Sequence, residues 1–219
     1  MTKRTDCLPQ YAPGEERFNA ISHGAGAVLA CVGLGALVSL AALYGDAWAV
    51  TASAVYGLSL VTLYLASTLY HASATPKIKS ALQVLDHCSI FLLIAGTYTP
   101  YTLITLRGPL GWGMFALVWA AAVAGVTLNI VDMKKYSKFS LICYLAMGWV
   151  VLAALGPLIR SLEIPGVILL ALGGAAYTGG VVFYKSKRRY MHAVWHLFVL
   201  AGSVLQYFSV LLYVIPNAF

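Results

Sequence analysis

The stretch PGVILLALGGAAYTGGVVFY, residues 165–184, decides the fold, because none of its side chains is charged. A helix needs about 20 apolar residues to cross the hydrocarbon core of a bilayer. Of the 219 residues in the chain, 61% are hydrophobic and only 10% are charged. Soluble domains carry about 25% charged residues. We therefore expect an integral, multi-pass membrane protein.

Six other segments resemble this one in length and composition. The seven predicted helices cover residues 19–43, 48–70, 82–106, 110–131, 139–159, 165–184 and 192–215. Because the connections between them are short, the prediction is an all-α, up-and-down bundle of seven transmembrane helices. The chain then divides into a short N-terminal segment, residues 1–18, and a membrane domain, residues 19–219.

Basic residues are distributed unevenly between the two ends of this bundle. Alternate connections group twelve of the fourteen Lys and Arg residues with the N-terminus and leave Arg107 and Arg160 at the other end. Cytoplasmic loops of membrane proteins are enriched in Lys and Arg. We therefore predict a cytoplasmic N-terminus and an outer C-terminus, in the inner (plasma) membrane of the cell. Topology accounts for the net charge of +7, so no nucleic-acid binding is expected.

All five histidines fall where a predicted helix meets the cytoplasmic end. Histidine at membrane depth is rare and indicates function by default. His192 and His196 are four residues apart, so both project from one helix face and can bind one metal ion. His71 would supply a third ligand, and three protein ligands plus water are typical of catalytic zinc. Alternatively, His192 lies among lipid headgroups and His196 hydrogen-bonds to a neighbouring helix.

Further polar residues are expected at the same level. Asp86 would hold a metal-bound water as a general base or orient a histidine; alternatively, it stabilises a helix N-terminus or pairs with Lys79. Ser67, one turn before His71, would bond a substrate carbonyl or bound water, or else its own helix backbone. Other residues either surround this site or lie at the membrane interface: His87, His23, Asn19 and Glu15, with Glu16 beside them.

The order of these motifs resembles the progestin and adiponectin receptor (PAQR) superfamily. Its elements here are Glu15-x3-Asn19-x3-His23, Ser67-x3-His71, Asp86-His87 and His192-x3-His196. The runs SHGAG, LASTLYH, LDHCSIFLLIAGTYTP and YLAMGW look like the bacterial hemolysin III branch. The superfamily is similar in turn to the alkaline ceramidases. The resemblance implies a seven-helix bundle, zinc held by His71, His192 and His196, and Asp86 and Ser67 beside a metal-bound water.

Three functions fit these features. The leading hypothesis is a zinc-dependent intramembrane hydrolase of lipid amides or esters, like the ceramidase-type activity of the adiponectin receptors. Membrane lipids would be its partners, and a fatty-acyl chain would lie between the helices. The second hypothesis is a pore-forming cytolysin, although no series of polar residues runs through the bundle. The third is a non-catalytic regulator of membrane lipid or energy homeostasis with a structural zinc.

Overall fold

Proline sets the beginning of several helices, because its fixed φ suits the first turn and its missing N–H is not needed there. In the computed structural model, which describes residues 8–9 and 11–216, Pro13 begins α1 (Pro13–Tyr44), Pro76 begins α3 (Pro76–Pro100) and Pro109 begins α4 (Pro109–Gly148). Two predicted boundaries were therefore wrong. Both α1 and α3 begin six residues earlier than predicted.

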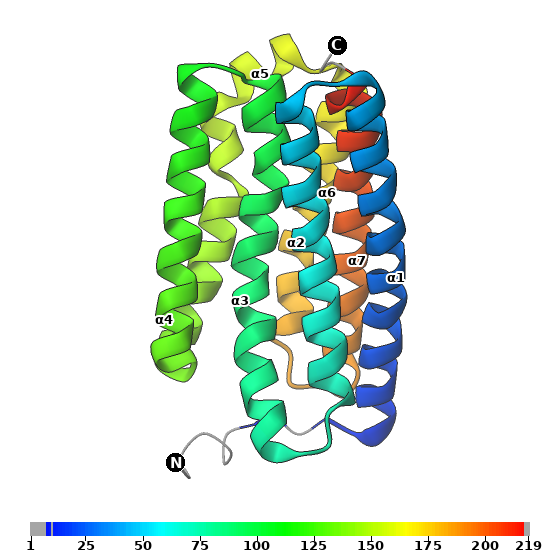
Figure 1. The fold of residues 1–219 in the computed structure, drawn as a ribbon. Coiled ribbons are helices and arrows are strands. Elements are labelled where there is room, and N and C mark those ends of the chain that lie inside the picture. Colours follow the sequence, from blue (N-terminus) through cyan, green and yellow to red (C-terminus); the bar gives the residue numbers. More distant parts are fainter. Residues whose placement is uncertain (1–7, 10, 217–219) are drawn as a thin grey trace.

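Three further helices follow the predicted segments closely: α2 (Ala47–Ala72), α6 (Ile164–Tyr184) and α7 (Met191–Ser209). The predicted helix 139–159 does not form one element, because α4 continues to Gly148 and α5 (Leu155–Ser161) has only seven residues. Two π-helical segments, η2 (Tyr101–Thr105) and η4 (Val210–Val214), continue α3 and α7, and the 3-10 segment η3 (Val150–Ala154) joins α4 to α5. Figure 1 shows these elements side by side in one elongated bundle. Within the described residues the protein is all helical.

Six helical stretches among the described residues are long and apolar enough to cross a membrane. The longest, Pro109–Ser161, has 53 residues and contains a break at Asp132 (φ −158°, ψ 86°). The Asn129 amide donates to the Tyr144 hydroxyl, although a continuous helix would place residues this far apart in sequence about 22 Å from each other. The chain therefore reverses at Asp132, and the predicted connection 132–138 is otherwise helical.

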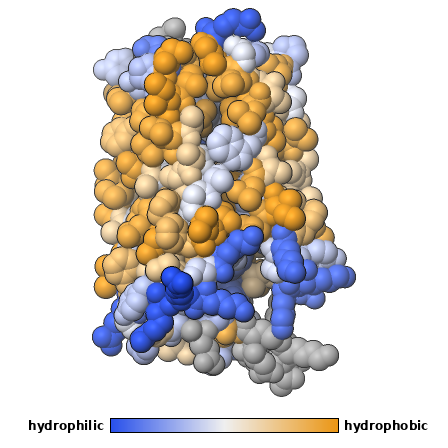
Figure 2. All heavy atoms as spheres, turned by 180° about the vertical axis from the view of Figure 1, so that it is seen from behind, coloured by the Kyte–Doolittle hydropathy of each residue, from blue (hydrophilic) through white to orange (hydrophobic). Residues whose placement is uncertain are grey.

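The surface of the bundle changes from polar to apolar along its length. Figure 2 shows a broad apolar band with hydrophilic residues at the two ends, most of them at the lower end. Exposed apolar side chains of several helices contribute to this surface, among them Val28, Leu58, Val123 and Val182. α1 begins at the lower end of Figure 1 and η4 ends at the upper end. This band has the character of a surface that contacts lipid.

Hydroxyl groups connect the helices in the interior. Tyr64 of α2 donates to Ser203 Oγ of α7 at 2.7 Å, and Tyr101 of η2 donates to Ser209 Oγ at 2.7 Å. Tyr98 of α3 donates to the Gly148 carbonyl at 3.0 Å and accepts from the Val151 amide at 2.8 Å, where α4 gives way to η3. Such bonds hold transmembrane helices together and satisfy broken backbone.

Close packing of α3 against α4 depends on Gly125. A Cβ atom at Gly125 would overlap the ring of Phe91, which is fully buried. A Cβ atom at Gly113, in the same helix, would meet nothing within 4 Å. The two glycines therefore provide a matched pair for testing this contact.

We expect Gly125→Ala to destabilise the protein by about 1–3 kcal/mol, because overpacking forces Phe91 or the helices to shift. The measurement is thermal unfolding of the purified protein in detergent. Gly113→Ala is expected to leave the unfolding temperature unchanged or higher, because alanine favours helix over glycine. Equal unfolding temperatures for wild type and Gly125→Ala would contradict the packing shown here.

Candidate metal centre

Three histidines meet at the lower end of the bundle. His71 is the next-to-last residue of α2, and His192 and His196 lie in the first two turns of α7. One ring nitrogen of each lies within 4.8 Å of the other two. The Nε2 atoms of His71 and His192 are 3.3 Å apart. The group can therefore hold a metal ion.

The geometry and chemistry of the three rings fit such an ion. Zinc–nitrogen bonds of about 2.0–2.1 Å in a tetrahedral site place two ligand nitrogens about 3.3 Å apart. Both nitrogens of His196 are buried and make no hydrogen bond of good geometry within the described residues, although the Asn19 backbone lies close to the ring. Buried polar groups are normally satisfied, and a cation would satisfy the His196 ring. Imidazole nitrogens suit zinc and several other transition metals, so the site alone does not select the metal.

A carboxylate lies behind the first of these histidines. Glu16 Oε2 accepts from His71 Nδ1 at 2.6 Å, while Glu16 Oε1 pairs with Lys79 Nζ at 2.8 Å. Lys79 also donates to the carbonyls of Tyr70 and Ser73 at the end of α2. With Nδ1 bonded to Glu16, His71 presents Nε2 to the site. A carboxylate in this position orients a ligand histidine and raises its basicity.

Tyr11 covers the second histidine. Its hydroxyl lies 3.1 Å from His192 Nδ1, and its ring centroid lies 4.6 Å from that of His192 and 5.7 Å from that of His71. Burial raises the pKa of Tyr11, so its hydroxyl stays protonated. The hydroxyl oxygen can accept from His192 Nδ1–H, which leaves Nε2 as the ligand atom.

Asp86 and Ser67 lie beside the histidines. Asp86 is only 5% exposed and is close to His71 and His87. Ser67 adjoins Asp86, but its hydroxyl makes no hydrogen bond of good geometry within the described residues. The two structural alternatives for Asp86 do not hold. Asp86 is the eleventh residue of α3, far from its N-terminus, and Lys79 pairs with Glu16 instead.

The other residues predicted to surround the metal site differ in their contacts with the three histidines. The His23 ring stacks on His196 with a centroid separation of 3.6 Å, and neither His23 nitrogen makes a hydrogen bond of good geometry within the described residues. Asn19 is fully buried and its amide is likewise unpartnered, and Glu15 is 3% exposed. His87 is further from the group, with Nδ1 bonded to the Gln83 carbonyl at 2.9 Å.

Glu16 and Tyr11 were not recognised from the sequence as partners of the ligand histidines. Pro13 could have indicated the role of Glu16, because proline is common at the first position of a helix. If α1 begins at Pro13, then Glu16, Asn19 and His23 lie at helical spacing on one face. Tyr11 lies before α1, in a segment without periodicity. No pattern in the sequence indicates its contact with a residue 181 positions away.

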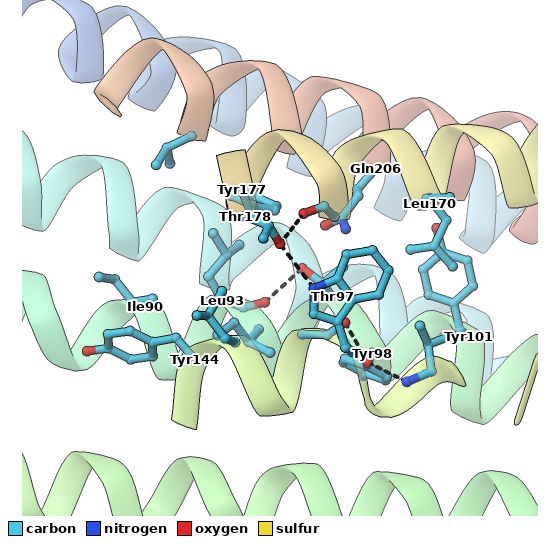
Figure 3. Close-up of a pocket in the computed structure, with 18 of the residues that line it drawn as sticks. Ile90, Leu93, Thr97, Tyr98, Tyr101, Tyr144, Leu170, Tyr177, Thr178 and Gln206 are labelled. Atoms are coloured by element: carbon cyan, nitrogen blue, oxygen red, sulfur yellow. Dashed lines mark hydrogen bonds between the residues drawn. The ribbon is translucent and has the colours of Figure 1, made fainter. Parts of the chain in front are cut away.

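An apolar cavity of about 190 Å³ extends from this site. His23 and Asp86 line its lower end, and Leu106 and Leu158 line its upper end. Its walls come from α3, the second half of α4, α6 and α7, as Figure 3 shows for the middle part. The polar site thus adjoins a space suited to a hydrocarbon chain.

Comparison with known proteins identifies one family and several relatives. Residues 11–207 match the model of a family described as "Haemolysin-III related". "Hemolysin-3" of Bacillus cereus is 45% identical over 219 residues, covering 100% of both chains. "Hemolysin-3 homolog" of Bacillus subtilis (strain 168) is 42% identical, covering 94% of this chain and 97% of the relative. "Monocyte to macrophage differentiation factor" of Homo sapiens is 30% identical, covering 96% of this chain and 90% of the relative.

Purified wild-type protein is expected to contain about one transition-metal ion per chain, and the double variant His192→Ala/His196→Ala almost none, because one histidine alone binds such ions weakly. Elemental analysis by mass spectrometry measures both. His87→Ala is the control, since its ring is bonded to backbone, and it should retain the metal. Equal metal content in the wild type and the double variant would remove the site.

Glu16→Gln is expected to weaken metal binding about 10- to 100-fold, the usual effect of losing a carboxylate behind a ligand histidine. Competition with a chromophoric chelator gives the affinity. Glu163→Gln removes an exposed carboxylate at the start of α6 and serves as the matched control. An unchanged affinity in Glu16→Gln would mean that the contact with His71 has no role in holding the ion.

Proposed function

Because the chain belongs to the Haemolysin-III related family, we propose that it is a zinc-dependent intramembrane hydrolase of lipid amides or esters. Its resemblance to the PAQR superfamily is confirmed, with the relative at 30% identity as its distant member. The observation that carries the proposal is the three-histidine group at the polar end of the bundle, next to His23 and Asp86, which line one end of an apolar cavity. A lipid there would have its polar group at the metal and its acyl chain in the cavity.

The proposed chemistry assigns a separate task to each residue. His71, His192 and His196 would hold the zinc. When bound, it would polarise the carbonyl of the lipid and lower the pKa of a water molecule to about 7. Asp86 accepts the proton of the attacking water and returns it to the leaving amine or alkoxide. The Ser67 hydroxyl, which makes no hydrogen bond of good geometry within the described residues, can donate to the oxygen on which negative charge develops.

The contacts of Asp86 and His23 support these roles. The Asp86 carboxylate has no lysine or arginine paired with it within the described residues, since Lys79 is held by Glu16. It therefore remains available for a proton. His23 stacks on His196 and helps to exclude water from the ligand, which strengthens electrostatic interactions inside the site.

We also propose seven crossings of the inner (plasma) membrane. The reversal at Asp132 supports two crossings for the stretch Pro109–Ser161. The basic residues of 134–138 and 185–189 lie in reversals at the end where α1 begins, which supports a cytoplasmic position for that end. On this topology the metal site lies close to the cytoplasmic surface.

The names of the bacterial relatives favour a second candidate, a pore-forming cytolysin, because both are hemolysin-3 proteins. In this chain the cavity wall is largely apolar, with Leu93, Leu145 and Leu170 among its residues. A wall of this kind suits a lipid chain better than a column of water. Membrane conductance that persists in the His192→Ala/His196→Ala variant would favour the pore instead.

Asp86→Asn is expected to retain the metal and to reduce fatty-acid release at least about 100-fold, because the proton acceptor is lost. The assay uses purified protein in lipid nanodiscs, with a fluorescent N-acyl sphingosine and an acyl ester of the same chain length as probes. Metal content is measured on the same samples. Wild-type protein that carries metal but releases no fatty acid from either probe would leave the regulator hypothesis in place of the hydrolase.

A further inference from the structure

One polar side chain in the middle of the apolar cavity has no hydrogen-bond partner within the described residues. Gln206 of α7 lines the cavity and is 8% exposed. An amide buried in an apolar medium without a hydrogen bond costs about 1–3 kcal/mol by mutational measures. A ligand that forms hydrogen bonds with the amide would remove this penalty. Figure 3 shows Gln206 across the cavity from Thr97 of α3.

The other polar groups at this level are already bonded. Thr97 Oγ1 donates to the Leu93 carbonyl at 2.8 Å, and Thr178 Oγ1 donates to the Gly174 carbonyl at 2.8 Å. The Tyr177 hydroxyl lies 2.7 Å from Ser203 Oγ. Gln206 is therefore the group at this level with both a donor and an acceptor to offer.

The neighbouring helix fixes the position of Gln206. A Cβ atom at Gly173 of α6 would meet Gln206 Cγ at 2.5 Å, so the absence of a side chain there makes room for the stem of the glutamine. The amide then faces the cavity. Gln206 lies ten residues after His196 in α7, which corresponds to about 15 Å along the helix. Thr97 lies eleven residues after Asp86 in α3, at a similar height of about 16 Å.

We propose that the cavity binds an acyl chain that carries a hydroxyl group part-way along its length, and that Gln206 hydrogen-bonds this hydroxyl. The inference rests on the proposed function in one respect, since it places the acyl carbonyl at the metal site. Because an extended zigzag chain with C–C bonds of about 1.5 Å advances only about 1.25 Å per carbon, it reaches the level of Gln206 after about twelve carbons. The remaining cavity, up to Leu106 and Leu158, accommodates the apolar end of the chain.

The test compares ricinoleate with oleate, two fatty acids that differ by a hydroxyl near the middle of the chain. Both are titrated into purified, metal-loaded protein in nanodiscs, in competition with a fluorescent fatty acid. Ricinoleate is expected to bind about 3- to 10-fold more tightly, which is the effect of one net hydrogen bond. Gln206→Leu should abolish the difference. Thr97→Val should preserve it, because the Thr97 hydroxyl already donates to the Leu93 carbonyl.

Other results would overturn the proposal. Equal affinities for the two fatty acids in the wild type, or a preference that survives Gln206→Leu, would mean that Gln206 does not recognise the hydroxyl group of the chain. Failure of both fatty acids to bind would remove the acyl cavity, and the hydrolase proposal would lose its support too. A preference for ricinoleate in a protein without hydrolytic activity would remove the hydrolase and leave the Gln206 site standing.

Thermal unfolding separates a ligand-binding role of Gln206 from a structural one. Because an unpaired buried amide lowers stability, Gln206→Leu without fatty acid should unfold at the wild-type temperature or above. Ricinoleate should then raise the unfolding temperature of the wild type more than that of the variant. A large loss of stability in the fatty-acid-free variant would assign Gln206 to helix packing and overturn the proposal.

Discussion

The absence of water in the hydrocarbon core is the constraint on which this structure depends, because each buried polar group there needs a partner from the protein. Most of the molecule obeys it. Threonine and serine hydroxyls donate to carbonyls one turn earlier in their own helix, as Thr68 does to Tyr64, and tyrosine hydroxyls cross to neighbouring helices. The exceptions in the part of the chain that the structure describes form two sets. Ser53, Tyr56 and Thr105 have unpartnered buried hydroxyls away from the histidines. The larger set lies at the lower end of the bundle and comprises His23, His196, Asn19, Ser67 and Tyr70.

The larger set supports the proposal that this site binds an ion. The Nε2 atoms of His71 and His192, 3.3 Å apart, can share one hydrogen bond, but both nitrogens of His196 have no partner of good geometry within the described residues. A cation bound among the three rings would satisfy His196 as well, and Glu16 would then balance part of its charge through His71. The Lys79–Glu16–His71 series also joins α3, α1 and α2 at the same end of the bundle. Metal binding and helix association are therefore expected to reinforce each other.

Sequence reasoning reached the membrane-spanning helices and the three histidines because both depend on local regularities. Long uncharged runs set the spans, and the His192-x3-His196 spacing places two rings on one face. It placed Glu16 near the site but did not predict its contact with His71, because that required the beginning of α1 at Pro13. It also placed a loop at 132–138, since the lysines there resemble a connection. In the structure Asp132 Oδ1 accepts from the Lys135 amide and caps a second helix at once. The cavity and Gln206 depend on how four helices pack, which no segment specifies alone.

The contact between Tyr11 and His192 would affect how quickly an ion at the proposed site is exchanged. The phenol ring lies against two of the three proposed ligand histidines, so a hydrated cation that approaches from the polar end of the bundle would have to displace it. The same barrier would slow release of a bound ion. Affinity and exchange rate are then separate properties of the site. The metal found in the mature protein would reflect the ions available while the chain was folding, more than those present afterwards.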